Sequence, residues 1–197
     1  MKRVALTILL ASIAAWPSLA QPLATAPDPR FDCVLEGISA EQRQMAASGD
    51  REELVDAAAD EAALNRAIAA GAEAEARRSA AVEAISANAR RCGAAAGWTD
   101  NQRELALQYV LMQLTREYMI RRYAAQNVEL TFIDTALATA RPDQPLPLDA
   151  LAARVRAQGI GDDRPDSPAD IVYIYLMIAA QSAEIRRRFD DPTFRPQ

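Results

Sequence analysis

Helix start signals recur along this chain and constrain its fold more than any other feature. In a capping box, a Ser, Thr or Asp side chain accepts a hydrogen bond from the backbone three residues later, and a Glu or Gln there bonds back. A proline directly after the capping residue also favours a helix start, because its φ is already helical. The signals are Ser39 with Gln42, Asp50 with Glu53, Thr99 with Gln102, and Ser167 before Pro168.

Glycines and prolines mark where these helices are expected to end. We expect a short helix ending near Ser48-Gly49, followed by a long Ala/Glu/Arg-rich hairpin that is interrupted at Gly71 and closed by Gly93. The remaining helices are expected over residues 99–126, 127–140 with Asn127 as cap, 148–158 and 167–189. No stretch shows the alternation typical of a β-strand. The sequence therefore predicts an all-α fold, a single-domain irregular helical bundle of about six or seven helices with one disulfide.

Two dense apolar segments identify the expected core. Apolar residues dominate 105–114, and an unbroken apolar run of ten residues covers 171–180. A run of ten is too short to span a membrane as a helix, so it is typical of a buried core helix. We expect the helices that carry these runs, about 100–125 and 168–189, to form a central pair. The helix around Ile133 and the Ala-rich segment then pack around that pair.

Cys33 and Cys92 are the only two cysteines. In an exported chain an isolated pair favours a disulfide, whereas a metal site needs more ligands and a redox pair is usually closer in sequence. The bond would close a segment of 59 residues, for which chain entropy predicts about 4 kcal/mol of stabilisation. Because alanine buries little more than one methyl group, the Ala-rich segment that carries Cys92 has particular need of a covalent tie.

The first twenty residues have the pattern of a secretory signal peptide. Lys2 and Arg3 form a short basic region, residues 4–15 are almost entirely apolar, and Ser18-Leu19-Ala20 matches the small-x-small pattern of a cleavage site. The apolar run is too short to span a bilayer. Cleavage is expected after Ala20, and the next residue is Gln21, so no cysteine marks a lipid anchor.

The expected organisation has three parts: a signal peptide over 1–20, a flexible Pro-rich leader over 21–30, and a helical domain over 31–197. Export places the protein in the periplasm or outside the cell. We expect no integral membrane segment after signal cleavage, because no other apolar run has the length of a span.

Two residue types that many enzymes use are absent from the expected mature chain. The chain has no histidine, and its only lysine, Lys2, leaves with the signal. The usual general base, the commonest zinc ligand and the Schiff-base amine are therefore missing. No phosphate loop, nucleophile elbow or CxxC motif is present. We expect a non-enzymatic protein without cofactor.

Charge excludes one class of partner. Without the signal, 20 basic and 27 acidic residues leave a net charge near −7. This balance argues against nucleic acid, whose phosphates are bound chiefly by positive charge. The leading hypothesis is an exported protein that acts through protein–protein interaction or a structural role, with another protein or an envelope component as partner.

The alternative hypothesis is a small-ligand carrier. All five tyrosines lie on the two expected central helices, and a cluster of phenols could line a cleft between residues 100–125 and 168–189. These weak ligand-binding candidates are Tyr109, Tyr118, Tyr123, Tyr173 and Tyr175. Against a shared cleft, Tyr173 and Tyr175 are two positions apart on one helix and cannot face the same way. An ordinary core, with hydroxyls reaching carbonyls or the surface, is the competing interpretation.

Charged groups supply weaker candidates. Glu52, Asp56 and Asp60 stack along one helical face, where a hard cation could relieve their repulsion. A solvated acidic face near a helix start explains them better. The loop aspartates and the arginine groups are likewise explained by turns, helix ends and solvated faces, so no metal site is expected. These residues are Asp162, Asp163 and Asp166, with Arg77-Arg78, Arg90-Arg91, Arg121-Arg122 and Arg186-Arg187-Arg188.

Overall fold

The computed structural model describes residues 27–47, 61–140, 146–161 and 167–191, without the side chains of 61–69. Within these residues the chain is entirely helical and forms one domain. A 3-10 helix, η2 (Pro29–Leu35), precedes six α-helices. They are α1 (Ala40–Ala47), α2 (Glu61–Ala96), α3 (Asp100–Ala124), α4 (Phe132–Thr139), α5 (Leu148–Arg156) and α6 (Pro168–Asp190). The all-α prediction is confirmed.

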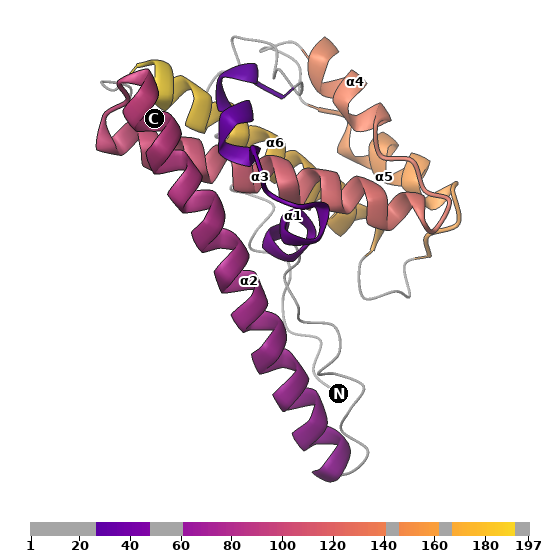
Figure 1. Ribbon diagram of the computed structural model, residues 1–197. Helices are drawn as coiled ribbons and strands as arrows, with labels where there is room; N and C mark the ends of the chain where they lie inside the picture. Colours follow the sequence, from indigo (N-terminus) through magenta and orange to yellow (C-terminus); the bar gives the residue numbers. More distant parts are fainter. Residues whose placement is uncertain (1–26, 48–60, 141–145, 162–166, 192–197) are drawn as a thin grey trace, which may run out of the picture.

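Helices α3 and α6 form the central pair and make the most extensive contact between any two helices (Figure 1). They run antiparallel, because Gln102 at the start of α3 donates to the carbonyl of Phe189 near the end of α6. Helices α4 and α5 lie together at one end of this pair, while η2, α1 and α2 pack at the other (Figure 1). The core accordingly divides into two clusters, one around α4, α5 and the start of α6, the other around η2, α2 and the end of α6.

The predicted helix starts at Ser39, Thr99 and Ser167 are confirmed. Thr99 and Ser167 each form a complete capping box, with Gln102 and Asp170 as the reciprocal partners. Ser39 and Gln42 make the same two reciprocal bonds at 2.9 and 3.1 Å. The box expected at Asp50 and Glu53 lies outside the described residues.

The predicted hairpin is wrong, because α2 is one continuous helix of 36 residues. It passes through both Gly71 and Gly93 and ends at Gly97, whose φ of +71° is the left-handed conformation that closes many helices. The amide of Trp98 bonds the carbonyl of Gly93 at 2.8 Å, the six-to-one bond of a Schellman motif. Gly93 therefore lies within the last turn, and Gly97 is the stop.

Asn127 is also not the helix cap that the sequence suggested. It has a φ of +61° and lies in the turn that terminates α3, where its amide bonds the carbonyl of Ala124. Asparagine tolerates this left-handed conformation better than most residues. Helix α4 begins five residues later, at Phe132 after Thr131, without a side-chain cap. Its apolar residues Phe132, Ile133 and Leu137 are buried as expected.

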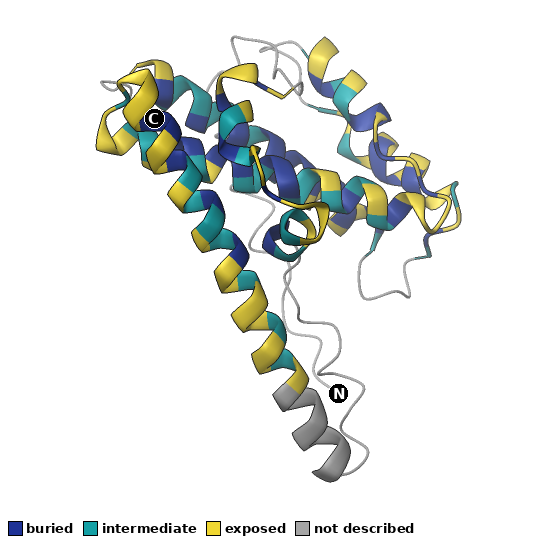
Figure 2. Ribbon diagram, viewed as in Figure 1, coloured by how far each residue is buried: buried dark blue, intermediate teal, exposed yellow. Residues whose placement is uncertain are grey.

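Helix α2 extends well beyond the other helices that the structure describes (Figures 1 and 2). At 1.5 Å per residue its length is about 54 Å, and its C-terminal part is anchored in the core. Ala81, Ile85, Ala89 and Cys92 form a single buried face there. From residue 70 to residue 80 no side chain is buried, and Figure 2 shows this stretch as mainly exposed. We call residues 61–80 the α2 arm.

The two glycines inside α2 should respond in opposite ways to alanine. A Cβ on Gly71 would meet nothing within 4 Å, whereas a Cβ on Gly93 would lie 2.4 Å from Cγ of Arg103. Alanine is preferred over glycine in a helix by about 1 kcal/mol, so Gly71→Ala should raise the free energy of unfolding by about 0.5–1 kcal/mol. Gly93→Ala should lower it by about 1 kcal/mol, because overpacking outweighs that gain. Urea denaturation of both variants checks this, and equal stabilisation by both would contradict it.

Candidate functional site

The five predicted tyrosines do not converge on one cleft. Tyr109 and Tyr175 are almost completely buried, in the two different core clusters, and Tyr123 is buried in the same cluster as Tyr175. Tyr118 is half-buried against the other cluster. Tyr173 is exposed on the outer face of α6, two positions from Tyr175, as their spacing requires. Tyr109, Tyr123 and Tyr175 are therefore core residues, and Tyr173 is a surface residue.

Tyr175 is part of a polar network that joins three helices. Its hydroxyl lies 2.9 and 3.0 Å from the two carboxylate oxygens of Asp134 on α4 and accepts a bond from Nε of Arg116 on α3 at 3.0 Å. Arg116 and Asp134 also form an ion pair with each other, and both side chains are largely buried. The Arg116 guanidinium lies over the Tyr175 ring, 5.5 Å from its centroid. Each polar group thus finds its partner within the network.

This arrangement stabilises the structure and is poorly suited to proton transfer. Burial is the main reason that the pKa of Tyr175 lies well above its usual value, with the neighbouring Asp134 carboxylate raising it further. A tyrosine acting as acid or base near neutral pH needs its pKa moved toward that range. The carboxylate of Asp134 is occupied by Arg116 and by the phenol. The network therefore holds α3, α4 and α6 together.

A second polar network fastens the start of the described chain to the end of α6. Asp28 is buried, and its carboxylate pairs with Arg30 at 2.6 Å and with Arg186 at 3.3 Å. The bond from Arg30 is the main reason that the pKa of Asp28 is lowered. Arg30 also pairs with Asp190. The amide of Asp28 donates to the Tyr109 hydroxyl at 3.2 Å, so residues 28–30, which the sequence placed in a flexible leader, are held in place.

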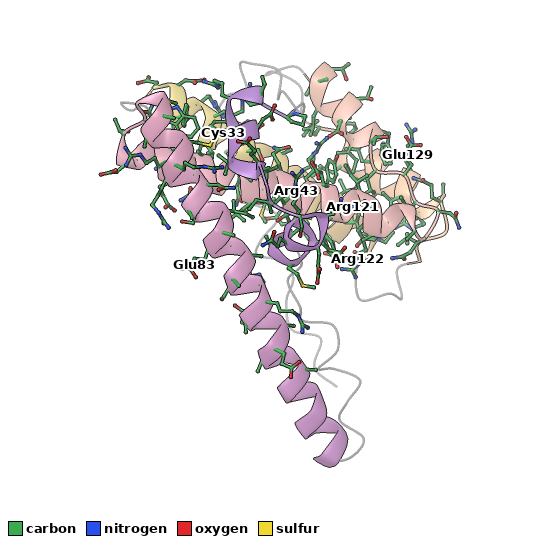
Figure 3. The ribbon with its side chains drawn as sticks, viewed as in Figure 1. Cys33, Arg43, Glu83, Arg121, Arg122 and Glu129 are labelled. Atoms are coloured by element: carbon green, nitrogen blue, oxygen red, sulfur yellow. A yellow bond between two sulfur atoms is a disulfide. The ribbon has the colours of Figure 1, made fainter. Side chains whose placement is uncertain are left out.

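The Cys33–Cys92 disulfide is present and joins η2 to α2, with 6.1 Å between the two Cα atoms. Figure 3 shows Cys33 at this junction. On the same side of the molecule, Phe31 makes ring contacts with Trp98, Tyr109 and Phe189 at centroid distances between 4.6 and 5.9 Å. The disulfide, the aromatic contacts and the Asp28 network together fix the N-terminal segment to α2, α3 and α6.

The charged candidates do not form a metal centre within the residues that the structure describes, where no group of three potential ligands comes together. The acids Glu52, Asp56 and Asp60, and the loop acids Asp162, Asp163 and Asp166, lie outside those residues. Among the arginines, Arg77 and Arg78 pair with Glu73 and Glu75 one turn away, and Arg91 lies 3.9 Å from Glu36. Arg121 and Arg122, which are labelled in Figure 3, lie at the C-terminal end of α3, where the helix dipole stabilises positive charge.

Sequence reasoning missed Asp28, Arg30 and Asp190 in one buried network and Arg116 and Asp134 in the other. Most of their partners lie far away in the chain, at separations of 18 residues for Arg116 with Asp134, 59 for Arg116 with Tyr175 and 160 for Arg30 with Asp190. Each looks like an ordinary surface charge in its own segment. The only signal was the general rule that a buried tyrosine hydroxyl needs a partner.

The α2 arm projects from the domain and is mainly exposed over residues 70–80 (Figure 2). Its exposed alanines, Ala72, Ala76 and Ala80, recur every four residues and form one small-residue face. On its flanks, Glu73 pairs with Arg77 at 3.8 Å and Glu75 with Arg78 at 3.3 Å. The flanks of the arm are therefore charged but internally balanced.

No protein-family model, curated protein or solved structure matches this chain. Among the helices in the described part of the chain, none is both long enough and apolar enough to cross a membrane.

Proposed function

We propose that this protein is an exported, non-enzymatic helical module that binds another protein through the α2 arm. The observation that carries the proposal is the arm itself, which projects from the domain and buries no side chain between residues 70 and 80. Most of the stability of protein helices comes from packing one face against other elements. The stretch over residues 70–80, which buries no side chain, therefore offers a surface for a partner.

The arm suits a helical protein partner in particular. Small side chains let two helix backbones approach closely, so that ridges and grooves interlock at an axial separation of about 8–10 Å. The face made by Ala72, Ala76 and Ala80 has this property, and the neighbouring ion pairs leave no net charge on the flanks. Such a surface favours neither nucleic acid nor an anionic lipid surface. An envelope protein with an exposed helix pair matches it.

A non-enzymatic role is supported by the state of the ionisable side chains. The buried carboxylates of Asp28 and Asp134 are each bound by arginine, and the phenol of Tyr175 is bound by both members of its network. Together with the lack of histidine in the sequence, this favours stabilising roles for these groups. The carrier hypothesis loses support because the five tyrosines are divided between two core clusters and the surface and do not line one cleft.

A photocrosslinking residue placed on the arm tests the proposal. At position 76 it should capture one discrete envelope protein, whereas at exposed Ala153 on α5, far from the arm, it should not. The captured protein, once identified and purified, should bind the wild-type chain. The double variant Ala72→Arg/Ala76→Arg should bind it about tenfold or more weakly, with an unchanged melting temperature because both positions are exposed. Equal binding by the double variant and by Ala153→Arg would overturn the proposal.

Export is a separate expectation of the same proposal. Mass spectrometry of the protein from its native host should find a chain that begins at or near Gln21, because the small-x-small pattern ends at Ala20. Cell fractionation should recover this form outside the cytoplasm. A chain that retains Met1 and stays in the cytoplasm would contradict the location without bearing on the arm.

A further inference from the structure

A small hollow of about 210 Å³ lies where the end of α2 meets the start of α3. Helix α2 contributes Ser86, Ala89 and Arg90, and α3 contributes Asp100, Arg103, Glu104 and Leu107. The hollow is below the roughly 300–1,000 Å³ typical of sites for drug-sized ligands. It has space for a molecule of only a few non-hydrogen atoms, and both charge signs line its walls.

Two of the four charged groups in the hollow neutralise each other, and two do not. Arg103 pairs with Asp100 at 2.8 Å. Arg90, on the α2 wall, bonds only the neutral hydroxyl of Ser86, at 2.9 Å. Glu104, on the α3 wall, bonds only the neutral amide of Gln108, at 3.1 Å. Among the described residues, neither Arg90 nor Glu104 has an oppositely charged side chain within ion-pair distance.

The two walls are held apart by a defined corner. The Schellman motif at Gly97 ends α2, and the capping box of Thr99 begins α3 directly after it. Cys92 and Ala89 anchor the α2 side, and Leu105 and Ala106 anchor the α3 side, all four buried in one core cluster. Arg90 and Glu104 are therefore presented by two fixed helices, and in the structure they bond Ser86 and Gln108 and not each other. A site with fixed walls loses little entropy when a ligand binds.

We infer that this hollow binds a small zwitterion, of the chemical class of a free α-amino acid. The ligand carboxylate pairs with the guanidinium of Arg90, and its ammonium group pairs with the carboxylate of Glu104. Charge-assisted bonds of both kinds are stronger than neutral hydrogen bonds. Ala89 and Leu107 provide an apolar surface for a short side chain. This small-molecule site is independent of the protein partner proposed for the α2 arm.

An NMR titration of the oxidised, ¹⁵N-labelled protein with L-alanine tests the inference. Because the charges are solvated and the hollow is open, we expect a dissociation constant of about 1 mM. Amide shifts should change around residues 86–90 and 100–107 and nowhere else. Sodium acetate and methylammonium chloride each supply only one of the two charges, so each should bind about tenfold or more weakly than L-alanine.

Four neutralising variants complete the test. Arg90→Gln and Glu104→Gln should each weaken L-alanine binding about tenfold or more. Arg91→Gln and Glu83→Gln are the controls, and each removes one charge from an exposed position of α2 that does not line the hollow. Figure 3 shows Glu83 directed away from the domain. Both control variants should leave L-alanine binding unchanged. No shift change at about 10 mM L-alanine, or binding of acetate as tight as that of L-alanine, would overturn the inference. Equal weakening by all four variants would also overturn it, because it would reflect net charge alone.

Discussion

Replacing Tyr175 by alanine should lower the free energy of unfolding by about 3–5 kcal/mol, the range for truncating a large buried aromatic side chain. Tyr175 is completely buried, so its removal leaves a cavity that the packed helices α3 and α6 cannot fill. It also deprives the Asp134 carboxylate of a hydrogen-bond donor and Arg116 of an acceptor in a largely buried network. Buried polar groups that lose a partner add a desolvation cost to that of the cavity.

Tyr173 provides a matched control, since it lies on the same helix two positions away and is 39% exposed. Tyr173→Ala should change the free energy of unfolding by no more than about 1 kcal/mol. Tyr175→Phe keeps the ring and removes only the hydroxyl, so its cost should be about 1–3 kcal/mol. Urea denaturation, with m-values compared, measures all three variants. A Tyr175→Ala variant as stable as Tyr173→Ala would show that the network does not hold the helices together.

Helix starts were predictable because their chemistry is local. The capping side chain of Ser39, Thr99 or Ser167 and the amide that it accepts from are three residues apart, so the short segment contains the whole interaction. The same holds for Gly159, which follows α5 with a φ of +99° as expected of a stop. Burial of most of the apolar residues in α3 and α6 was also predictable, because segments so rich in large apolar side chains are stabilised when they are removed from water. Tyr173 and Ile174 in the α6 run are exposed.

Helix ends and interruptions were harder to predict, because the conformation of a glycine depends on its surroundings. Of the three glycines within and directly after α2, Gly71 and Gly93 are helical and Gly97 has a positive φ. Gly93 is explained by packing, since the Arg103 side chain occupies the space where a Cβ would lie. Nothing in the sequence around residue 93 reveals that contact, because Arg103 belongs to the next helix.

The buried polar networks could not be predicted for the same reason at longer range. Asp28 pairs with Arg30 two residues away, but also with Arg186 on α6, which lies far away in the sequence. Arginine groups at the end of a helix normally indicate a solvated face, yet Arg186 pairs with the buried carboxylate of Asp28. The hollow between α2 and α3 similarly depends on how two helices meet, so the role of Arg90 and Glu104 follows only from the fold.

Removing the disulfide with Cys33→Ser should be the other large perturbation. The bond joins residues 59 positions apart, for which the chain-entropy model predicts a loss of about 4 kcal/mol. For a chain of this size that corresponds to a fall in melting temperature of about 10 °C. The effect should be concentrated in α2, because the anchored face of that helix consists largely of alanine and buries little area. Hydrogen exchange should therefore show faster exchange in α2 than in α6.

Other contacts between α2 and the N-terminal segment remain when the disulfide is removed. Asn88 donates to the carbonyls of Val34 and Glu36, and Ile85 is completely buried against the same cluster. They should keep the single variant folded at low temperature. Cys92→Ser and the double variant Cys33→Ser/Cys92→Ser should be destabilised by the same amount as Cys33→Ser, because each removes the same single bond. An unchanged melting temperature in all three variants, with wild-type exchange rates in α2, would contradict the prediction. It would mean that the contacts of Asn88 and Ile85 suffice to anchor the helix without the disulfide.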